Sequence, residues 1–121
     1  IFSLWKTLSN AYNFNLKIFL QPIPSWFNKP LSIEEKTLFS ILDNSNDKAH
    51  INLKKLSSID NYNKFLLILE KISKKHNVEF IDLNKELLKI KNIDKWLFVD
   101  RVHMTNQGYE DLAEIVLKNI S

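Results

Sequence analysis

The stretch that decides the fold is FVDRVHMT, residues 98–105, in which Asp100 and His103 stand three residues apart. A short apolar run, 96–99, leads into the pair, and a segment with helical periodicity follows it as far as Ile120. A carboxylate that accepts a hydrogen bond from one imidazole nitrogen fixes the tautomer and leaves the other nitrogen free to take a proton. This spacing is therefore typical of a histidine base with its orienting carboxylate.

The segment resembles the last conserved block of the SGNH (GDSL-type) hydrolases, in which an Asp-x-x-His pair supplies two members of a Ser-His-Asp triad. Beside the pair, Thr105, Gly108 and Ala113 stand where that block has Thr or Ser, Gly and Ala. The resemblance implies that His103 is the catalytic base and Asp100 its partner, with no cofactor and no metal. It also implies the fold class, α/β, as the C-terminal portion of a flavodoxin-like three-layer α/β/α domain with a parallel sheet.

The other motifs of that family are missing from this chain. In the family, the nucleophilic serine lies in a Gly-Asp-Ser motif near the N-terminus, and the oxyanion hole uses a glycine and the asparagine of a Gly-x-Asn-type block. Gly108 is the only glycine here. We therefore expect residues 1–121 to form a single partial domain that needs the missing N-terminal part of the same domain as its partner. Any signal or anchor would lie upstream of Ile1, which leaves cell envelope and cytoplasm both open.

The resemblance implies serine esterase chemistry. His103 would deprotonate the absent serine, the serine would attack the carbonyl of a small-molecule or sugar ester, and Asp100 would stabilise the imidazolium. The 121 residues alone are then expected to be inactive. Two alternatives stay open: transfer of an acyl group to a cell-envelope sugar by the same triad, and a non-catalytic remnant or binding domain in which the pair only packs.

Composition and charge argue against several other classes. The net charge of +3 comes from lysines interspersed with acids, with Arg101 as the only arginine, which is a weak signal for nucleic acid. The chain has no cysteine, so it has neither disulfides nor thiolate metal sites. No apolar run approaches the roughly 18 residues of a membrane span. A metal at the pair would need further ligands, yet neither His50 nor His76 stands at a ligand spacing, and we expect both to face solvent.

Periodicity predicts alternating helices and strands. Residues 2–13 have the apolar spacing of an amphipathic helix, and 16–20 form a short buried strand that prolines terminate. After a loop at 22–31, Ser32 and Glu35 form the signature of a capping box. The remaining expected segments are an exposed polar insertion at 43–59, a helix from Asp60 to about His76, a strand at 78–83, a helix at 84–91, and a last helix capped by Thr105 or Asn106. Two strands joined through a long helix favour parallel pairing.

Three further residues have more than one interpretation. Gly108 falls in the first turn of the last helix, where a missing side chain lets that turn approach another segment closely. Trp26 and Phe27 fit either a hydrophobic lid or core aromatics. Arg101 fits a contact with a substrate anion, a contact with the acidic end of a neighbouring loop, or a surface charge.

Overall fold

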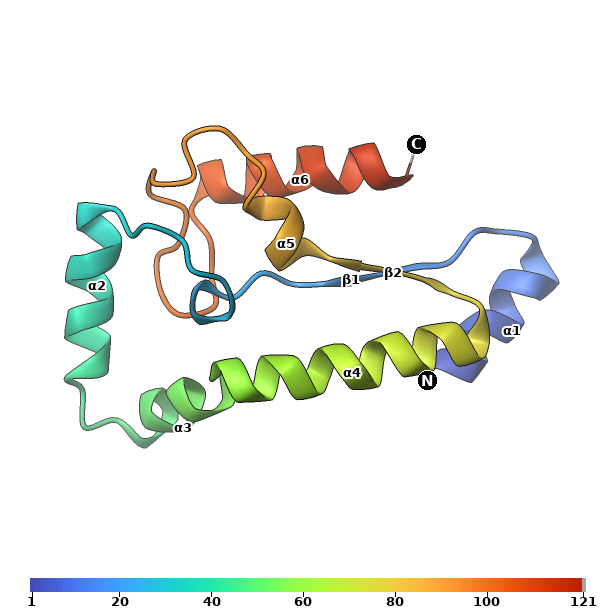
Figure 1. Cartoon of the computed structure of the whole chain (residues 1–121), viewed down its shortest axis with the longest axis horizontal. Coiled ribbons are helices and arrows are strands. Elements are labelled where there is room, and N and C mark those ends of the chain that lie inside the picture. Colours follow the sequence, from blue (N-terminus) through green and yellow to red (C-terminus); the bar gives the residue numbers. More distant parts are fainter. Residues whose placement is uncertain (121) are drawn as a thin grey trace.

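A computed structural model describes residues 1–120 and shows a small parallel sheet enclosed by helices (Figure 1). Strand β1 (Lys17–Leu20) pairs with β2 (Glu79–Asp82) in parallel. Helix α4 (Ile59–His76) lies on one side of the strands, and α6 (Asn106–Ile120) lies on the other (Figure 1). The α/β class and the parallel pairing are thus confirmed.

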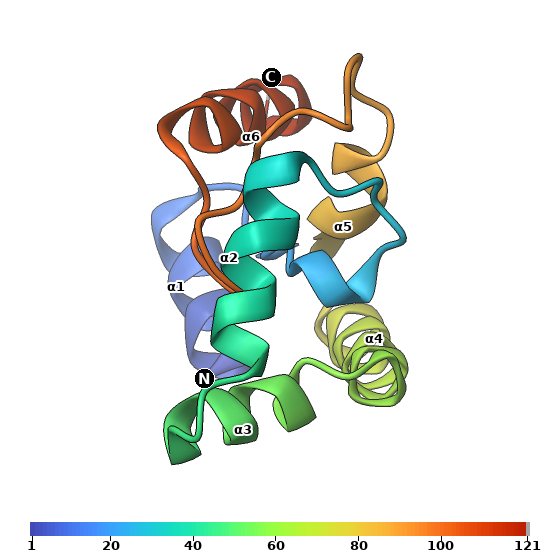
Figure 2. The same cartoon turned by 90° about the vertical axis from the view of Figure 1, so that its left-hand side faces the viewer.

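Of the remaining elements, α1 (Phe2–Tyr12) lies near the end of the sheet where both strands begin, and the others lie toward the end where both strands finish (Figure 1). Figure 2 looks along α4 and shows α2 and α3 in front of it. The elements toward the finishing end are the 3₁₀ turn η1 (Pro24–Trp26), α2 (Ile33–Asp43), α3 (Lys48–Leu56) and α5 (Leu83–Leu87).

The polar segment at 43–59 contains a helix. Asp47 caps α3 by accepting a hydrogen bond from the backbone N–H of Ala49, and no residue of the helix is buried. His50 lies on α3 and is half-buried, as is His76, so the expectation that both face solvent is wrong. A local cap and a basic C-terminal end are enough to favour this helix over a loop.

Two predicted helix boundaries are also wrong. The cap of α4 is Ser58, whose hydroxyl accepts from the N–H of Asn61, whereas Asp60 lies inside the first turn. Helix α5 ends at Leu87 instead of continuing to 91, because the chain turns there and packs Ile90 and Ile93 against the core.

The core joins the ends of the strands to α6 and to the aromatic loop. Phe27 packs on Phe98 with ring centroids 6.1 Å apart, and Trp26 stacks on Tyr62 at 5.3 Å. Both Trp26 and Phe27 are buried, which makes them core aromatics and not a lid. The main buried cluster consists of Phe27, Phe39, Ile81, Leu83, Leu87, Leu97, Phe98, Met104 and Ile115.

Gly108 makes the close approach that its position in the last helix predicts. A Cβ atom at this residue would lie 2.5 Å from the carbonyl oxygen of Leu97 and 3.0 Å from side-chain atoms of Met104. Thr105 caps α6 by accepting a hydrogen bond of 3.0 Å from the Gly108 N–H. The first turn of α6 is thereby pressed against the backbone that precedes the Asp-x-x-His segment.

A buried ion pair holds the same backbone from the other side. The side chains of Glu35 and Lys29 are fully buried and 2.5 Å apart. Glu35 Oε2 also accepts from the N–H of Ser32, which completes the predicted capping box. Its other oxygen, Oε1, accepts from the N–H groups of Leu97 and Phe98 at 3.0 and 3.1 Å. One carboxylate thus links the start of α2, the loop before it and the segment that leads to Asp100.

We predict that Glu35→Gln lowers the free energy of unfolding by about 3–5 kcal/mol, because it leaves the Lys29 ammonium buried without its counter-charge. Urea denaturation of the protein measures this. Glu34→Gln is the matched control, since Glu34 is the exposed neighbour in the same helical turn, and it should lose much less stability, only that of an exposed negative charge at a helix N-terminus. The double variant Glu35→Gln/Lys29→Met should recover part of the loss. Equal midpoints for Glu35→Gln and Glu34→Gln would contradict the assignment.

Candidate active site

Asp100 and His103 lie at the tip of a tight antiparallel turn. The Thr105 N–H donates to the Leu97 carbonyl at 2.8 Å, and the Val99 N–H donates to the His103 carbonyl at 3.0 Å. These bonds close the chain on itself between the buried cluster and the first turn of α6. The backbone of residues 100–103 is therefore fixed at both ends.

The Asp100 carboxylate uses its two oxygens differently. Oδ1 accepts from the backbone N–H groups of Val102 and His103, at 2.7 and 2.6 Å. Oδ2 lies 2.7 Å from Nδ1 of the His103 ring. The backbone bonds orient the carboxylate, and the carboxylate orients the imidazole. With Nδ1–H as the donor, the lone pair of the ring stands on Nε2, where a proton can be accepted.

The electrostatics keep Asp100 charged. Burial raises the pKa of Asp100, but the hydrogen bonds from the His103 N–H, the His103 ring and the Val102 N–H outweigh it, so the pKa lies below its ordinary value. The two side chains are not enclosed: that of His103 is 66% exposed and that of Asp100 is 34% exposed. Nε2 of His103 can therefore be reached by a group from outside the described residues.

The carboxyl ends of both strands support the turn. Gln21, which directly follows β1, donates from Nε2 to the Val102 carbonyl at 3.1 Å. Asn84, fully buried after β2, accepts from the N–H of Ile23 and donates to the Gln21 carbonyl and to Asp82 Oδ1. In open α/β sheets, ligands bind at the carboxyl ends of the strands. The Asp100–His103 pair lies at that end.

Arg101, between the two members of the pair, points toward α2. Its Nη2 donates to Asp43 Oδ2 at 2.6 Å, and its guanidinium lies over the Phe39 ring, 4.3 Å from the centroid. Of the three interpretations of Arg101, the structure shows the contact with an acidic neighbour. That neighbour, Asp43, is the last residue of α2. This pairing fixes the turn laterally.

The structure brings the two predicted site residues together and leaves out a nucleophile. Among residues 1–120, no serine hydroxyl is hydrogen-bonded to His103, and no group of three or more His, Asp or Glu side chains could hold a metal ion. Sequence reasoning missed the supporting residues Lys29, Asn84 and Gln21, and it gave Glu35 only its role as a cap. The sequence feature that could have indicated Lys29, Asn84 and Gln21 is their position beside strand ends and prolines.

Comparison with protein-family models and with curated proteins finds no match for this chain. Within the described residues, every helix is too short or too polar to cross a bilayer.

We predict that the carboxyl carbon of Asp100, followed by NMR, titrates below the ordinary value of about 3.9 because hydrogen bonds favour the charged form. A folded-state pKa below the unfolded one means that the contribution of Asp100 to stability is present above about pH 4 and is lost as the pH falls through the folded pKa. His103→Ala removes one of the three lowering contacts and keeps the backbone N–H groups, so it should raise the pKa partway. An unchanged pKa in that variant would show that the ring contact is not formed in solution.

Proposed function

We propose that this chain supplies the base and its carboxylate to a serine esterase of the SGNH type. The observation that carries the proposal is the double use of Asp100, whose Oδ1 is fixed by backbone N–H groups while Oδ2 holds Nδ1 of His103 at 2.7 Å. A carboxylate fixed in this way sets the imidazole tautomer and stabilises the imidazolium, the role of the acid in a Ser-His-Asp triad.

The proposed chemistry proceeds in two halves. Nε2 of His103 takes the proton of a serine hydroxyl as the serine oxygen bonds to the ester carbonyl carbon, and the carbonyl π electrons move to oxygen. The tetrahedral intermediate then expels the alcohol, which receives the proton from Nε2, and leaves an acyl-serine. Water repeats the sequence and releases the acid. Throughout, Asp100 remains ionised and holds Nδ1–H.

The order of elements supports the family and the flavodoxin-like fold as proposals. A parallel pair of strands stands between helices, and the Asp100–His103 turn follows the last strand and leads directly into α6. The proposed three-layer domain would continue this small sheet with strands from the N-terminal part. Fold alone does not define an activity, so the proposal depends on the site.

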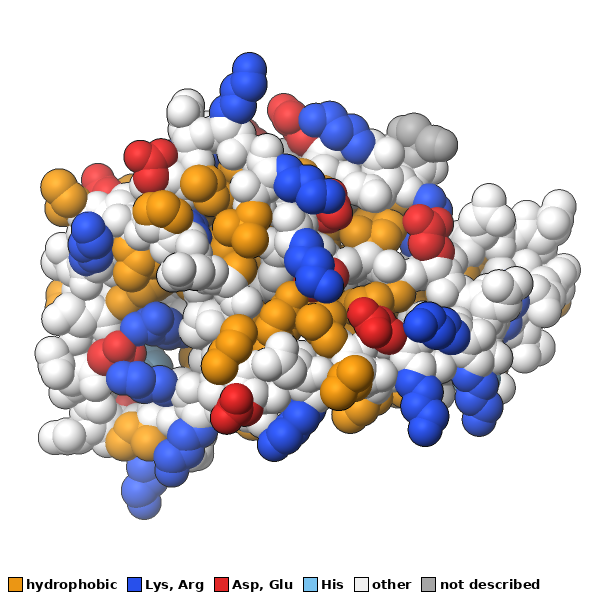
Figure 3. All heavy atoms as spheres, viewed as in Figure 1, with side chains coloured by type: hydrophobic (Ala, Val, Ile, Leu, Met, Phe, Trp, Pro, Cys, Tyr) orange, Lys and Arg blue, Asp and Glu red, His pale blue; other side chains and the backbone are white. Residues whose placement is uncertain are grey.

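Exposed apolar side chains support a further part of the same domain. On α1 the side chains of Leu4 and Trp5 are 62% and 51% exposed, and on α4 those of Leu67 and Ile68 are 68% and 54% exposed. Figure 3 shows hydrophobic side chains gathered along α4. Apolar area of this kind is typical of a covered interface. We propose that the covering part also carries the serine and the oxyanion-hole donors.

We predict that, in the full-length protein, His103→Ala lowers kcat for a p-nitrophenyl ester by on the order of a thousandfold or more. The reason is that the serine loses its proton acceptor while the rest of the site remains. His76→Ala is the matched control, because His76 lies at the far end of α4, and it should leave kcat unchanged. Circular dichroism checks that both variants are folded.

The 121-residue chain alone should show no His103-dependent hydrolysis, because its described residues place no serine at the ring. Full-length protein that turns over equally well with His103→Ala would contradict the esterase proposal and favour a binding role. His103-dependent turnover by the 121 residues alone would contradict the proposal that the nucleophile lies elsewhere.

A further inference from the structure

A cavity of about 360 Å³ lies beside Asp100, between α2, α3 and the Asp100–His103 turn. Its volume falls within the range of about 300–1,000 Å³ that small-molecule sites occupy. Much of its wall is apolar. The lining residues that matter here are Leu42, Leu53, Ile51, His50, Lys54 and Arg101.

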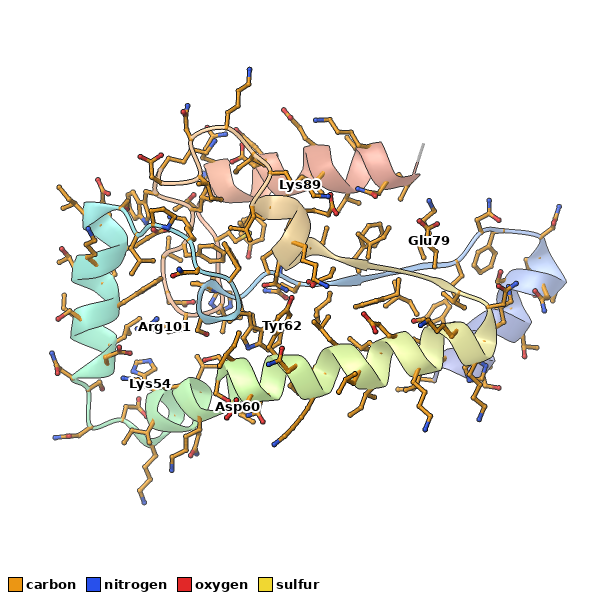
Figure 4. The ribbon with its side chains drawn as sticks, in the orientation of Figure 1. Lys54, Asp60, Tyr62, Glu79, Lys89 and Arg101 are labelled. Carbon is orange, nitrogen blue, oxygen red and sulfur yellow. The ribbon has the colours of Figure 1, made fainter. Side chains whose placement is uncertain are left out.

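Carboxylates neutralise part of the positive charge in this wall, and one cation is left without a counter-charge. Asp43 Oδ2 pairs with Arg101 at 2.6 Å and with Lys54 at 3.2 Å (Figure 4 labels both cations). Burial raises the pKa of Asp43, but the bonds from Arg101 and Lys54 outweigh it, so Asp43 stays ionised. The Asp100 carboxylate is hydrogen-bonded to the His103 ring. Lys55, which also lines the cavity, forms no ion pair among the described residues. The cavity therefore favours an anion.

Two nitrogen atoms at this cavity lack a hydrogen-bond partner. Arg101 Nε and His50 Nδ1 are both excluded from solvent and both unpaired within residues 1–120. Because a water-sized group reaches neither atom, neither can bind a ligand oxygen in this arrangement. A cation that a ligand can reach in this wall is the exposed ammonium of Lys55.

We propose that this cavity binds a short aliphatic chain that carries a carboxylate or a second carbonyl oxygen, as part of the ester substrate. The chain lies against Leu42, Ile51 and Leu53, and the oxygen pairs with the Lys55 ammonium. The inference rests on the proposed function, because it assigns the cavity to the same substrate. It names the substrate class as a short-chain ester with an additional acidic or carbonyl group.

The test uses hexanoate as probe and methyl NMR of the full-length protein. Hexanoate should produce saturable shifts at the methyl groups of Leu42, Ile51 and Leu53, whereas hexylammonium should not. Leu53→Trp should abolish the shifts by filling the cavity. Leu88→Trp, which places the same ring at an exposed position just after α5 and outside the cavity, is the matched control and should retain them.

A second pair of variants covers the case in which Leu53→Trp does not fold. Lys55→Glu should weaken hexanoate binding about two- to fivefold, as expected for an exposed charge pair. Lys75→Glu is its control, because Lys75 is an exposed lysine of α4 outside the cavity, and it should have no effect.

Three results would overturn the inference: no saturable shifts, equal binding of hexylammonium at the same methyl groups, or equal weakening by Lys55→Glu and Lys75→Glu. His103→Ala separates this inference from the proposed function. Because His103 does not line the cavity, that variant should bind hexanoate as the wild type does. Binding without any His103-dependent turnover would contradict only the esterase proposal, and turnover without binding would contradict only the inference about the cavity.

Discussion

The buried pair of Glu35 and Lys29 is the interaction on which the candidate site depends. Two opposite charges that lose their water are stable only when each makes its full set of hydrogen bonds. Both oxygens of Glu35 do so: they accept hydrogen bonds from Lys29, from the backbone N–H at the cap of α2 and from the two backbone N–H groups of 97–98. The segment that leads to Asp100 can therefore take one position relative to α2. Gly108 reinforces this, since any larger residue there would push α6 away from Leu97.

The strands contribute a second constraint of a different kind. A sheet of two short strands orders little by itself, yet both strands end where Asn84 and Gln21 bind the loops and the carbonyl of Val102. The backbone around Asp100 is thus fixed by polar side chains that are themselves buried or held. The tip, where the His103 ring is 66% exposed, is left accessible. This combination of rigid backbone and open ring suits a base that meets its partner group from outside.

Much of the fold followed from local patterns. The helix starting after Ser32 and the last helix after Thr105 were predictable because capping acts over three residues, and the two strands because apolar runs end at prolines or polar residues. The pair Asp100–His103 was predictable for the same reason. The role of Glu35 beyond its cap was not, because its bonds to Leu97 and Phe98 join residues more than 60 positions apart. The same holds for Asn84, whose partners lie across the sheet, and for the cavity, which forms only when α3 packs against α2.

The central claim is that Glu35 fixes the backbone that carries the candidate base. Amide hydrogen exchange at Leu97 and Phe98, compared in the wild type and in Glu35→Gln, tests it most directly. We predict slow exchange at both amides in the wild type and faster exchange in the variant. We also predict that the contact between Asp100 and His103 loosens in the variant. Fast exchange at both amides in the wild type would contradict the account, because these N–H groups would then not be held by the buried carboxylate.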